Sequence, residues 1–203
     1  MNKYFKYNNY IYFFFTCIIN LFSPIIKIWE TKYIKKYSGQ VLKYQPVFII
    51  GAPRTGSTIL YQTLTNQLDV LYINNLICKF NKNIFFGFWL SKKLFHNKSH
   101  DCFTSNHGDT SECGLNAPSE CGGFWYRWLR RDRHFIDYED ITSDMVKEIG
   151  MEITAVINHF DKPIIFNNNN IGLRIRLIKK IFPNAKYIMV DREPFYVSQS
   201  LLM

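Results

Sequence analysis

The sequence predicts an α/β fold in which a P-loop-like, doubly wound parallel sheet is flanked by helices. The first observation is a short apolar stretch, residues 47–50, followed by a Gly-Ala-Pro-Arg-Thr-Gly turn and a helical pattern from Ser57. The second is the alternation of strand-like and helix-like segments through residues 143–203. With 203 residues, of which 47% are hydrophobic, the chain is long enough for a domain with a substantial core.

The glycine turn at residues 51–56 is typical of a phosphate-binding loop. A predicted buried strand leads into it, and Leu60, Leu64 and Leu68 give the following helix an apolar face. Backbone N–H groups and the helix dipole attract a phosphate to such a helix N-terminus. The NTPase pattern requires a lysine directly after the second glycine, where this chain has Ser57, so hydrolysis of ATP or GTP is disfavoured.

The second half of the chain supplies the other strands and helices. We expect helices over residues 143–160, 171–182 and from about 195, and strands over residues 163–166 and 186–191. The helix at 171–182 has a basic face that includes Arg174. Because doubly wound sheets bind ligands at the carboxyl ends of their strands, we expect Arg54 and Arg192 on the same rim.

The middle of the chain gives weaker signals. An aromatic-rich helix is expected within residues 80–95, a polar loop over residues 97–116, and a further helix over residues 121–133.

The first 45 residues form an apolar and basic arm ahead of a domain at residues 46–203. The most apolar window, residues 10–29, has the length of a bilayer span, although Pro24 and Lys27 weaken that interpretation. More lysines follow the window than precede it, which predicts that the domain lies on the cytoplasmic side. Two interpretations stay open: the arm associates with an anionic membrane surface, or it is a helix packed on the domain.

Charge and cysteine content argue against two classes of function. The net charge is +9, but seven lysines and only one acidic residue lie in residues 1–46, so no nucleic-acid-binding face is indicated in the domain. The five cysteines are odd in number and include no Cys-x-x-Cys pair. Neither a disulfide framework nor a metal site is therefore expected.

Two motifs resemble those of the sulfotransferase superfamily. Residues 46–60, Pro-Val-Phe-Ile-Ile-Gly-Ala-Pro-Arg-Thr-Gly-Ser-Thr-Ile-Leu, resemble the family's 5′-phosphosulfate loop. Residues 182–194, Phe-Pro-Asn-Ala-Lys-Tyr-Ile-Met-Val-Asp-Arg-Glu-Pro, resemble its 3′-phosphate motif, in which Ser200 follows Arg192 by eight positions. Both segments occur in the family's order and at the ends of predicted strands.

The resemblance implies an enzyme that moves the sulfuryl group of 3′-phosphoadenylyl sulfate (PAPS) to a hydroxyl or amine without a metal. Arg54 would contact the bridging oxygen and the sulfuryl group, because its planar guanidinium can hold two anionic oxygens. The resemblance assigns the 5′-phosphate to Thr55, Gly56, Ser57 and Thr58, and the 3′-phosphate to Arg192 and Ser200.

The acceptor side is predicted at residues 116–128, which resemble a segment of one sulfotransferase branch. Glu120 is the candidate general base, since the neighbouring Cys-Gly-Gly turn and aromatic residues would reduce its solvation. The alternative is a capping or ion-paired glutamate, and Glu112 and His107 are lesser candidates. The arginines of this region would steer an anionic acceptor or form a solvated helix face: Arg127, Arg130, Arg131 and Arg133. Carbohydrate, lipid, small alcohol and peptide acceptors all remain open.

Two rival hypotheses accompany the enzyme. The chain stops within its last predicted helix, whereas family members usually continue, so the first rival is a truncated, inactive domain that at most binds PAPS or its product PAP. The second is a nucleotide kinase-like protein, which the serine at position 57 disfavours.

Overall fold

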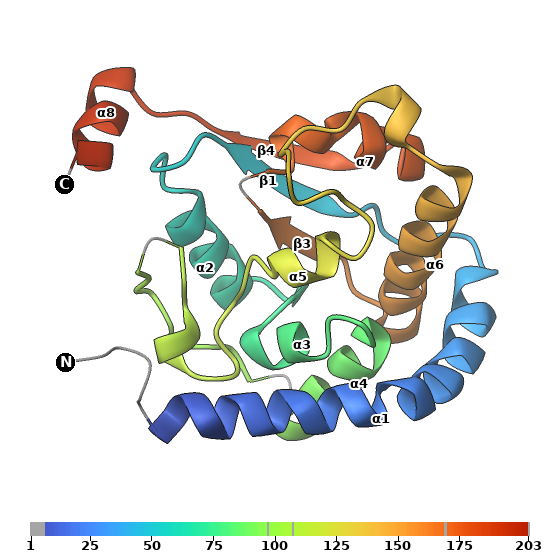
Figure 1. The fold of residues 1–203 in the computed structure, drawn as a ribbon. Helices are drawn as coiled ribbons and strands as arrows, with labels where there is room; N and C mark the ends of the chain where they lie inside the picture. The colour runs from blue at the N-terminus through green and yellow to red at the C-terminus, as the bar shows by residue number, and fades with distance from the viewer. Residues whose placement is uncertain (1–6, 97, 107, 169, 203) are drawn as a thin grey trace.

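A computed structural model describes residues 7–96, 98–106, 108–168 and 170–202 (Figure 1). Its four strands are β1 (Val47–Gly51), β2 (Leu71–Tyr72), β3 (Ile164–Asn167) and β4 (Lys186–Val190). They form one parallel sheet in the order β2-β3-β1-β4. The predicted parallel α/β fold is confirmed, and the crossovers place two distant segments, β1 and β4, side by side.

Eight α-helices accompany the sheet within the described residues. They are α1 (Tyr7–Ser38), α2 (Ser57–Gln67), α3 (Asn75–Lys79), α4 (Ile84–Phe95), α5 (Gly122–Trp125), α6 (Ser143–Phe160), α7 (Ile175–Ile181) and α8 (Pro194–Leu202). Short 3₁₀ turns lie at Ser111–Cys113, Tyr138–Asp140 and Gly172–Arg174. The predicted strands and the helix at 143–160 are confirmed within one residue at either end, whereas β2 and α3 were not predicted.

The side chains of β1 alternate between two cores, as expected for a strand covered on both faces. Phe48 and Ile50 point into the larger core, where the ring of Phe48 stacks on Phe166 with centroids 5.2 Å apart. Ile49 points the other way and packs with Tyr61 of α2 and Ile165 of β3. The two cores make this sheet the rigid base from which the loops at its carboxyl edge extend.

The face that α2 buries is only partly the predicted one: Leu60 and Leu64 pack, half-buried, against the core that contains Ile49. The buried residues of α2 are Ser57, Tyr61, Gln62 and Thr65, whereas Leu68 lies just beyond the helix and is 50% exposed. The polar side chains find internal partners, because Gln62 donates to the carbonyl of Thr104 at 2.9 Å. A leucine spacing alone does not reveal a helix face whose polar groups are satisfied within the protein.

Helix α6 forms as predicted. Thr142 caps it by accepting a hydrogen bond from the backbone N–H of Met145 at 3.2 Å. The residues of the predicted apolar face are all less than 10% exposed: Met145, Ile149, Ile153, Val156 and Ile157. All five residues of this stripe belong to the larger core.

Two helix predictions in the rest of the chain are wrong in part. The helix expected over 121–133 is reduced to the four residues of α5. Arg127, which follows α5, pairs with Glu152 of α6. Arg174, expected on a solvent-facing basic surface, is only 2% exposed. Its Nε donates to the carbonyl of His134 at 3.1 Å, and its guanidinium lies 5.1 Å from the centre of the Tyr126 ring.

The second half of α1 packs along α4 and α6, in agreement with the packed-helix interpretation of the arm (Figure 1). Glu30 is fully buried there and accepts hydrogen bonds from Asn83 Nδ2 at 3.2 Å and from the N–H of Phe86 at 3.3 Å. Lys27 lies 3.2 Å from Glu30 and 3.0 Å from Glu152. Burial raises the pKa of Glu30, and Lys27 opposes that rise. Among the described residues, no helix combines the length and apolar character that a membrane crossing needs.

Gly51 of β1 pairs with Val190 of β4, and we predict that it tolerates no side chain. A Cβ at Gly51 would lie 2.7 Å from the carbonyl oxygen of Val190 and 2.9 Å from Thr55 Oγ1. Gly51→Ala is therefore expected to lower the free energy of unfolding, measured in urea, by about 1–3 kcal/mol. Gly172→Ala is the matched control, because nothing lies within 4 Å of a Cβ there. Equal stability of the two variants would contradict the tight approach.

Candidate active site

The turn between β1 and α2 has the shape of a phosphate-binding loop. Gly56 adopts a left-handed conformation with φ of 96°, and Arg54 also has a positive φ of 68°. Thr55 Oγ1 donates to the carbonyl of Ala52 at 2.8 Å and closes the turn. Gly56 has no side chain with which to cap α2, so the first N–H groups of the helix are left for a ligand.

Three residues that are far apart in sequence meet beside this loop. Nε of Arg54 donates to Ser200 Oγ at 2.9 Å and to the Ser200 carbonyl at 3.1 Å. Arg192 Nη1 donates to the carbonyl of Arg54 at 3.2 Å. The expected meeting of Arg54 and Arg192 on one rim therefore occurs, and α8 brings Ser200 to the same place.

A pocket of about 440 Å³ opens between these residues and the loop. It is lined by Pro53, Arg54, Gly56, Ser57, Thr58, Ile59, Ser105, Gly108, Arg192 and Ser200. Of the predicted nucleotide-binding residues, only Thr55 is not in this lining, and its hydroxyl is engaged in the turn itself. Two guanidinium groups and a helix N-terminus at one pocket suit a ligand with several anionic groups.

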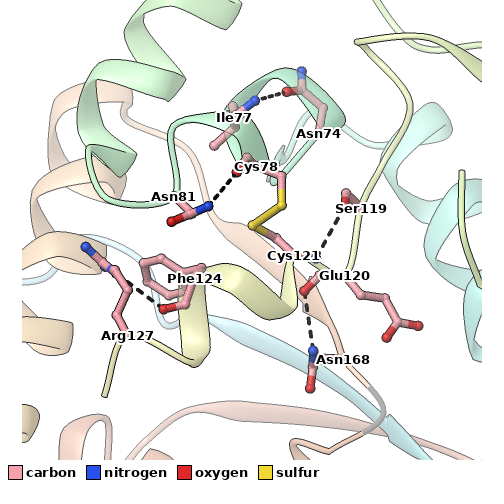
Figure 2. The surroundings of a disulfide bond; sticks show 10 residues. All are labelled: Asn74, Ile77, Cys78, Asn81, Ser119, Glu120, Cys121, Phe124, Arg127 and Asn168. Atoms are coloured by element: carbon pink, nitrogen blue, oxygen red, sulfur yellow. Dashed lines mark hydrogen bonds between the residues drawn. A yellow bond between two sulfur atoms is a disulfide. The ribbon is translucent and has the colours of Figure 1, made fainter. Parts of the chain in front are cut away.

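Glu120 lies beside this pocket, behind the segment that contains Gly108. A Cβ at Gly108 would be 3.4 Å from Glu120 Oε1 and 3.8 Å from Thr58 Oγ1. Gly108 therefore lies between the Glu120 carboxylate and the phosphate loop. The half-buried side chain of Glu120 points away from the disulfide next to it (Figure 2). Its backbone carbonyl accepts a hydrogen bond from Asn168 Nδ2 at 3.4 Å.

Asn167 is a site residue that the sequence reasoning missed. Its Nδ2 donates to Glu120 Oε1 at 3.4 Å, and the residue is only 3% exposed. It ends β3 and pairs in register with Ile49 of β1. A polar residue directly after a buried apolar strand was the available signal, since that position faces the ligand edge of a doubly wound sheet.

The comparison with family models decides the family. A model described as "Sulfotransferase family" matches residues 46–203, most of the chain. The chain belongs to the sulfotransferase family.

Two distant relatives among the curated proteins match this sulfotransferase-family chain. They are named omega-hydroxy-beta-dihydromenaquinone-9 sulfotransferase Stf3, from Mycobacterium bovis (strain ATCC BAA-935 / AF2122/97) and Mycobacterium tuberculosis (strain CDC 1551 / Oshkosh). Each is 20% identical over 205 aligned positions, which cover 91% of this chain and 51% of the relative. The chain thus spans about half the length of the curated relatives that it matches. The comparison with solved structures gave no significant match.

No disulfide framework was expected, but the structure contains one disulfide bond. Cys78 and Cys121 are bonded in this sulfotransferase-family domain, with Cα atoms 5.4 Å apart and a sequence separation of 43 (Figure 2). Cys17, Cys102 and Cys113 are free. The odd number of cysteines gave no sign of the Cys78–Cys121 bond, because a single bond among five cysteines produces no regular spacing in the sequence.

The disulfide fixes the end of the Glu120 segment. Cys121 has a positive φ of 42° and directly follows Glu120, and its bond ties the segment to the end of α3. Disulfides persist mainly in oxidising compartments. The cytoplasmic location stays a prediction from the flanking lysines, and the disulfide counts against it.

The arginines of the acceptor segment have carboxylate or aromatic neighbours. Arg127 pairs with Glu152 and its guanidinium lies 3.8 Å from the centre of the Trp128 ring. Ion pairs also join Arg130 to Asp132 and Arg133 to Asp140, and Arg131 lies over Tyr126. Each of these arginines has a carboxylate or ring neighbour within the protein, so steering of an anionic acceptor has no separate support.

Two further expectations concern His107 and metals. His107 lies outside the described residues, and Glu112 is exposed in the turn Ser111–Cys113. Among the residues that the structure describes, no group of three His, Cys, Asp or Glu side chains is arranged to hold a metal ion.

We predict that the Cys78–Cys121 bond contributes to stability. For the 43-residue separation, replacing both cysteines by serine should lower the free energy of unfolding by about 2–4 kcal/mol. Thermal or urea unfolding measures the change, and Cys17→Ser, at an exposed free cysteine, is the control. If a reducing agent left the wild-type midpoint unchanged, the bond would contribute nothing.

Proposed function

We propose that this chain is a PAPS-dependent sulfotransferase domain that transfers a sulfuryl group to a hydroxyl acceptor. The observation that carries the proposal is the convergence of Arg54, Arg192 and Ser200 with the phosphate loop at one pocket. Family membership supports the reaction class. The pocket chemistry fits PAPS, which has anionic groups on both its 5′ and 3′ sides.

In this proposal the phosphate loop holds the 5′ side of the nucleotide. The N–H groups of Gly56, Ser57 and Thr58 stand at the N-terminus of α2, where the helix dipole favours a negative charge. Arg192 and Ser200 hold the 3′-phosphate. Arg54 and Ser200 are hydrogen-bonded to each other in the structure. A nucleotide that binds between the phosphate loop and the 3′-phosphate residues must break this hydrogen bond. We therefore expect α8 to shift when PAP binds.

PAPS, when bound, supplies the sulfuryl group and leaves as PAP. Glu120 accepts the proton of the acceptor hydroxyl. The acceptor's oxygen forms the new S–O bond on the side of the sulfur opposite the S–O bond to the phosphate, which breaks. Arg54 stabilises the negative charge that develops as the electron pair of the breaking bond passes to the phosphate oxygen. Asn167 keeps the Glu120 carboxylate turned toward the pocket by donating to Oε1.

A hydroxyl is favoured over an amine as the acceptor group. The mycobacterial relatives are named for a hydroxylated menaquinone derivative, although the chain spans only 51% of each. Carbohydrate, lipid and small-molecule hydroxyls all remain candidates, and peptides remain open. Transfer of labelled sulfate from PAPS to lipid and glycan extracts would identify the class.

The two rival hypotheses predict different results for PAP binding, sulfate transfer and phosphorylation. A domain that only binds PAP would give calorimetric binding and no labelled product. A kinase would phosphorylate with ATP, but Ser57 stands where a P-loop lysine would reach the β- and γ-phosphates. Absence of PAP binding by the folded chain would overturn the sulfotransferase and the PAP-binding hypotheses together.

We predict different defects for the two arginines. Arg54→Ala should lower kcat by about 10²–10³-fold, because it removes charge stabilisation in the transition state. Arg192→Ala should weaken PAP binding, measured by calorimetry, by about 10–100-fold, the value of a charged hydrogen bond. Arg176→Ala is the control, since that exposed arginine lies outside the pocket. Unchanged PAP affinity in Arg192→Ala would rule out the 3′-phosphate assignment.

We also predict that Glu120 and Asn167 act on the chemical step. Glu120→Gln should lower kcat by about 10²–10⁴-fold with little change in PAP affinity. Asn167→Ala should lower kcat about 10-fold, since it only orients the carboxylate. Glu139→Gln is the matched control, because Glu139 is exposed and lies outside the pocket lining. If Glu120→Gln retained full activity, the base would have to be another residue.

A further inference from the structure

One face of α1 is apolar although it points away from the protein. Leu21, Ile25 and Ile28 are 73%, 64% and 77% exposed, and their spacing of four and three residues aligns them along the helix. Glu30 and Ile34, on the opposite side of the helix, are buried. The exposed leucine and isoleucines therefore form a continuous stripe, which we call the outer stripe.

The same face becomes basic toward the end of the helix. Lys32, Lys35 and Lys36 are exposed and continue the helical spacing of the outer stripe. Glu30 is the only carboxylate in α1, and it is buried and paired with Lys27. The outward face thus combines apolar side chains with positive charge and carries no negative charge of its own.

We propose that the outer face of α1 docks on a lipid membrane surface that contains anionic headgroups. The outer stripe would enter the headgroup and acyl boundary, and the three lysines would contact the headgroups. Charge complementarity favours anionic lipid over a neutral apolar partner. The proposal concerns a helix that lies on the surface, and it does not depend on the sulfotransferase activity.

The position of α1 makes such docking compatible with an open site. In Figure 1, α1 runs along one side of the molecule, and α8 lies on the opposite side. Among the side chains that the structure describes, none of α1 lines the pocket beside α2 and α8. Docking through the outer face would therefore leave the pocket free to bind nucleotide.

Flotation of the purified full chain with vesicles tests the proposal. We expect binding to vesicles of phosphatidylcholine with 30% phosphatidylserine, little binding to phosphatidylcholine alone, and weaker binding at high salt. Ile25→Asp with Ile28→Asp should weaken binding at least 10-fold. Replacing Lys32, Lys35 and Lys36 by glutamine should weaken it about 100-fold, since each lysine contributes separately.

Leu94→Asp is the matched control, because Leu94 is an equally apolar residue, 55% exposed, on another helix. Urea unfolding of each variant, followed by circular dichroism, reports whether the domain remains folded, independently of vesicle binding and of nucleotide binding. The proposal is overturned if the wild type does not bind anionic vesicles, or if the Ile25 and Ile28 double variant binds as well as the control. It is also overturned if the outer stripe instead forms a dimer, seen by light scattering, that the double variant dissociates.

Discussion

The parallel pairing of β1 with β4 is the constraint on which the candidate site depends. Gly51 faces Val190 in register at the carboxyl ends of the two strands, closer than any side chain at position 51 would allow. Because both strands end there, the loops that follow them begin side by side, and Arg192 reaches the carbonyl of Arg54. A site assembled from segments about 140 positions apart in sequence thus follows from one close backbone contact.

The elements that were predictable are those whose periodicity and end signals agree. Helix α6 has an apolar stripe and a capping threonine, and β1, β3 and β4 are short apolar stretches bounded by turn residues. The rim position of Arg54 and Arg192 followed from the topology alone. Where the stripe was partly polar, as at Gln62 and Thr65 of α2, the sequence could not show which face is buried.

The acceptor side was harder to predict because tertiary contacts shape it. Asn167 and Glu120 come from segments 47 positions apart, and no local pattern shows that the two side chains meet. The bond between Cys78 and Cys121 and the burial of Arg174 likewise join distant parts of the chain. Such pairings depend on the finished sheet, so reading residues in order singled out Glu120 but not its partner Asn167.

The buried carboxylate of Glu30 has a consequence for the geometry of the whole molecule. Its partners, Asn83, the Phe86 N–H and Lys27, fix both the rotation and the axial position of α1. Sliding or turning the helix would leave a buried charge unpaired, at a cost of about 3–5 kcal/mol. The N-terminal helix is therefore held in a fixed orientation on the domain. Any surface to which it attaches sets the angle at which the nucleotide pocket faces its surroundings.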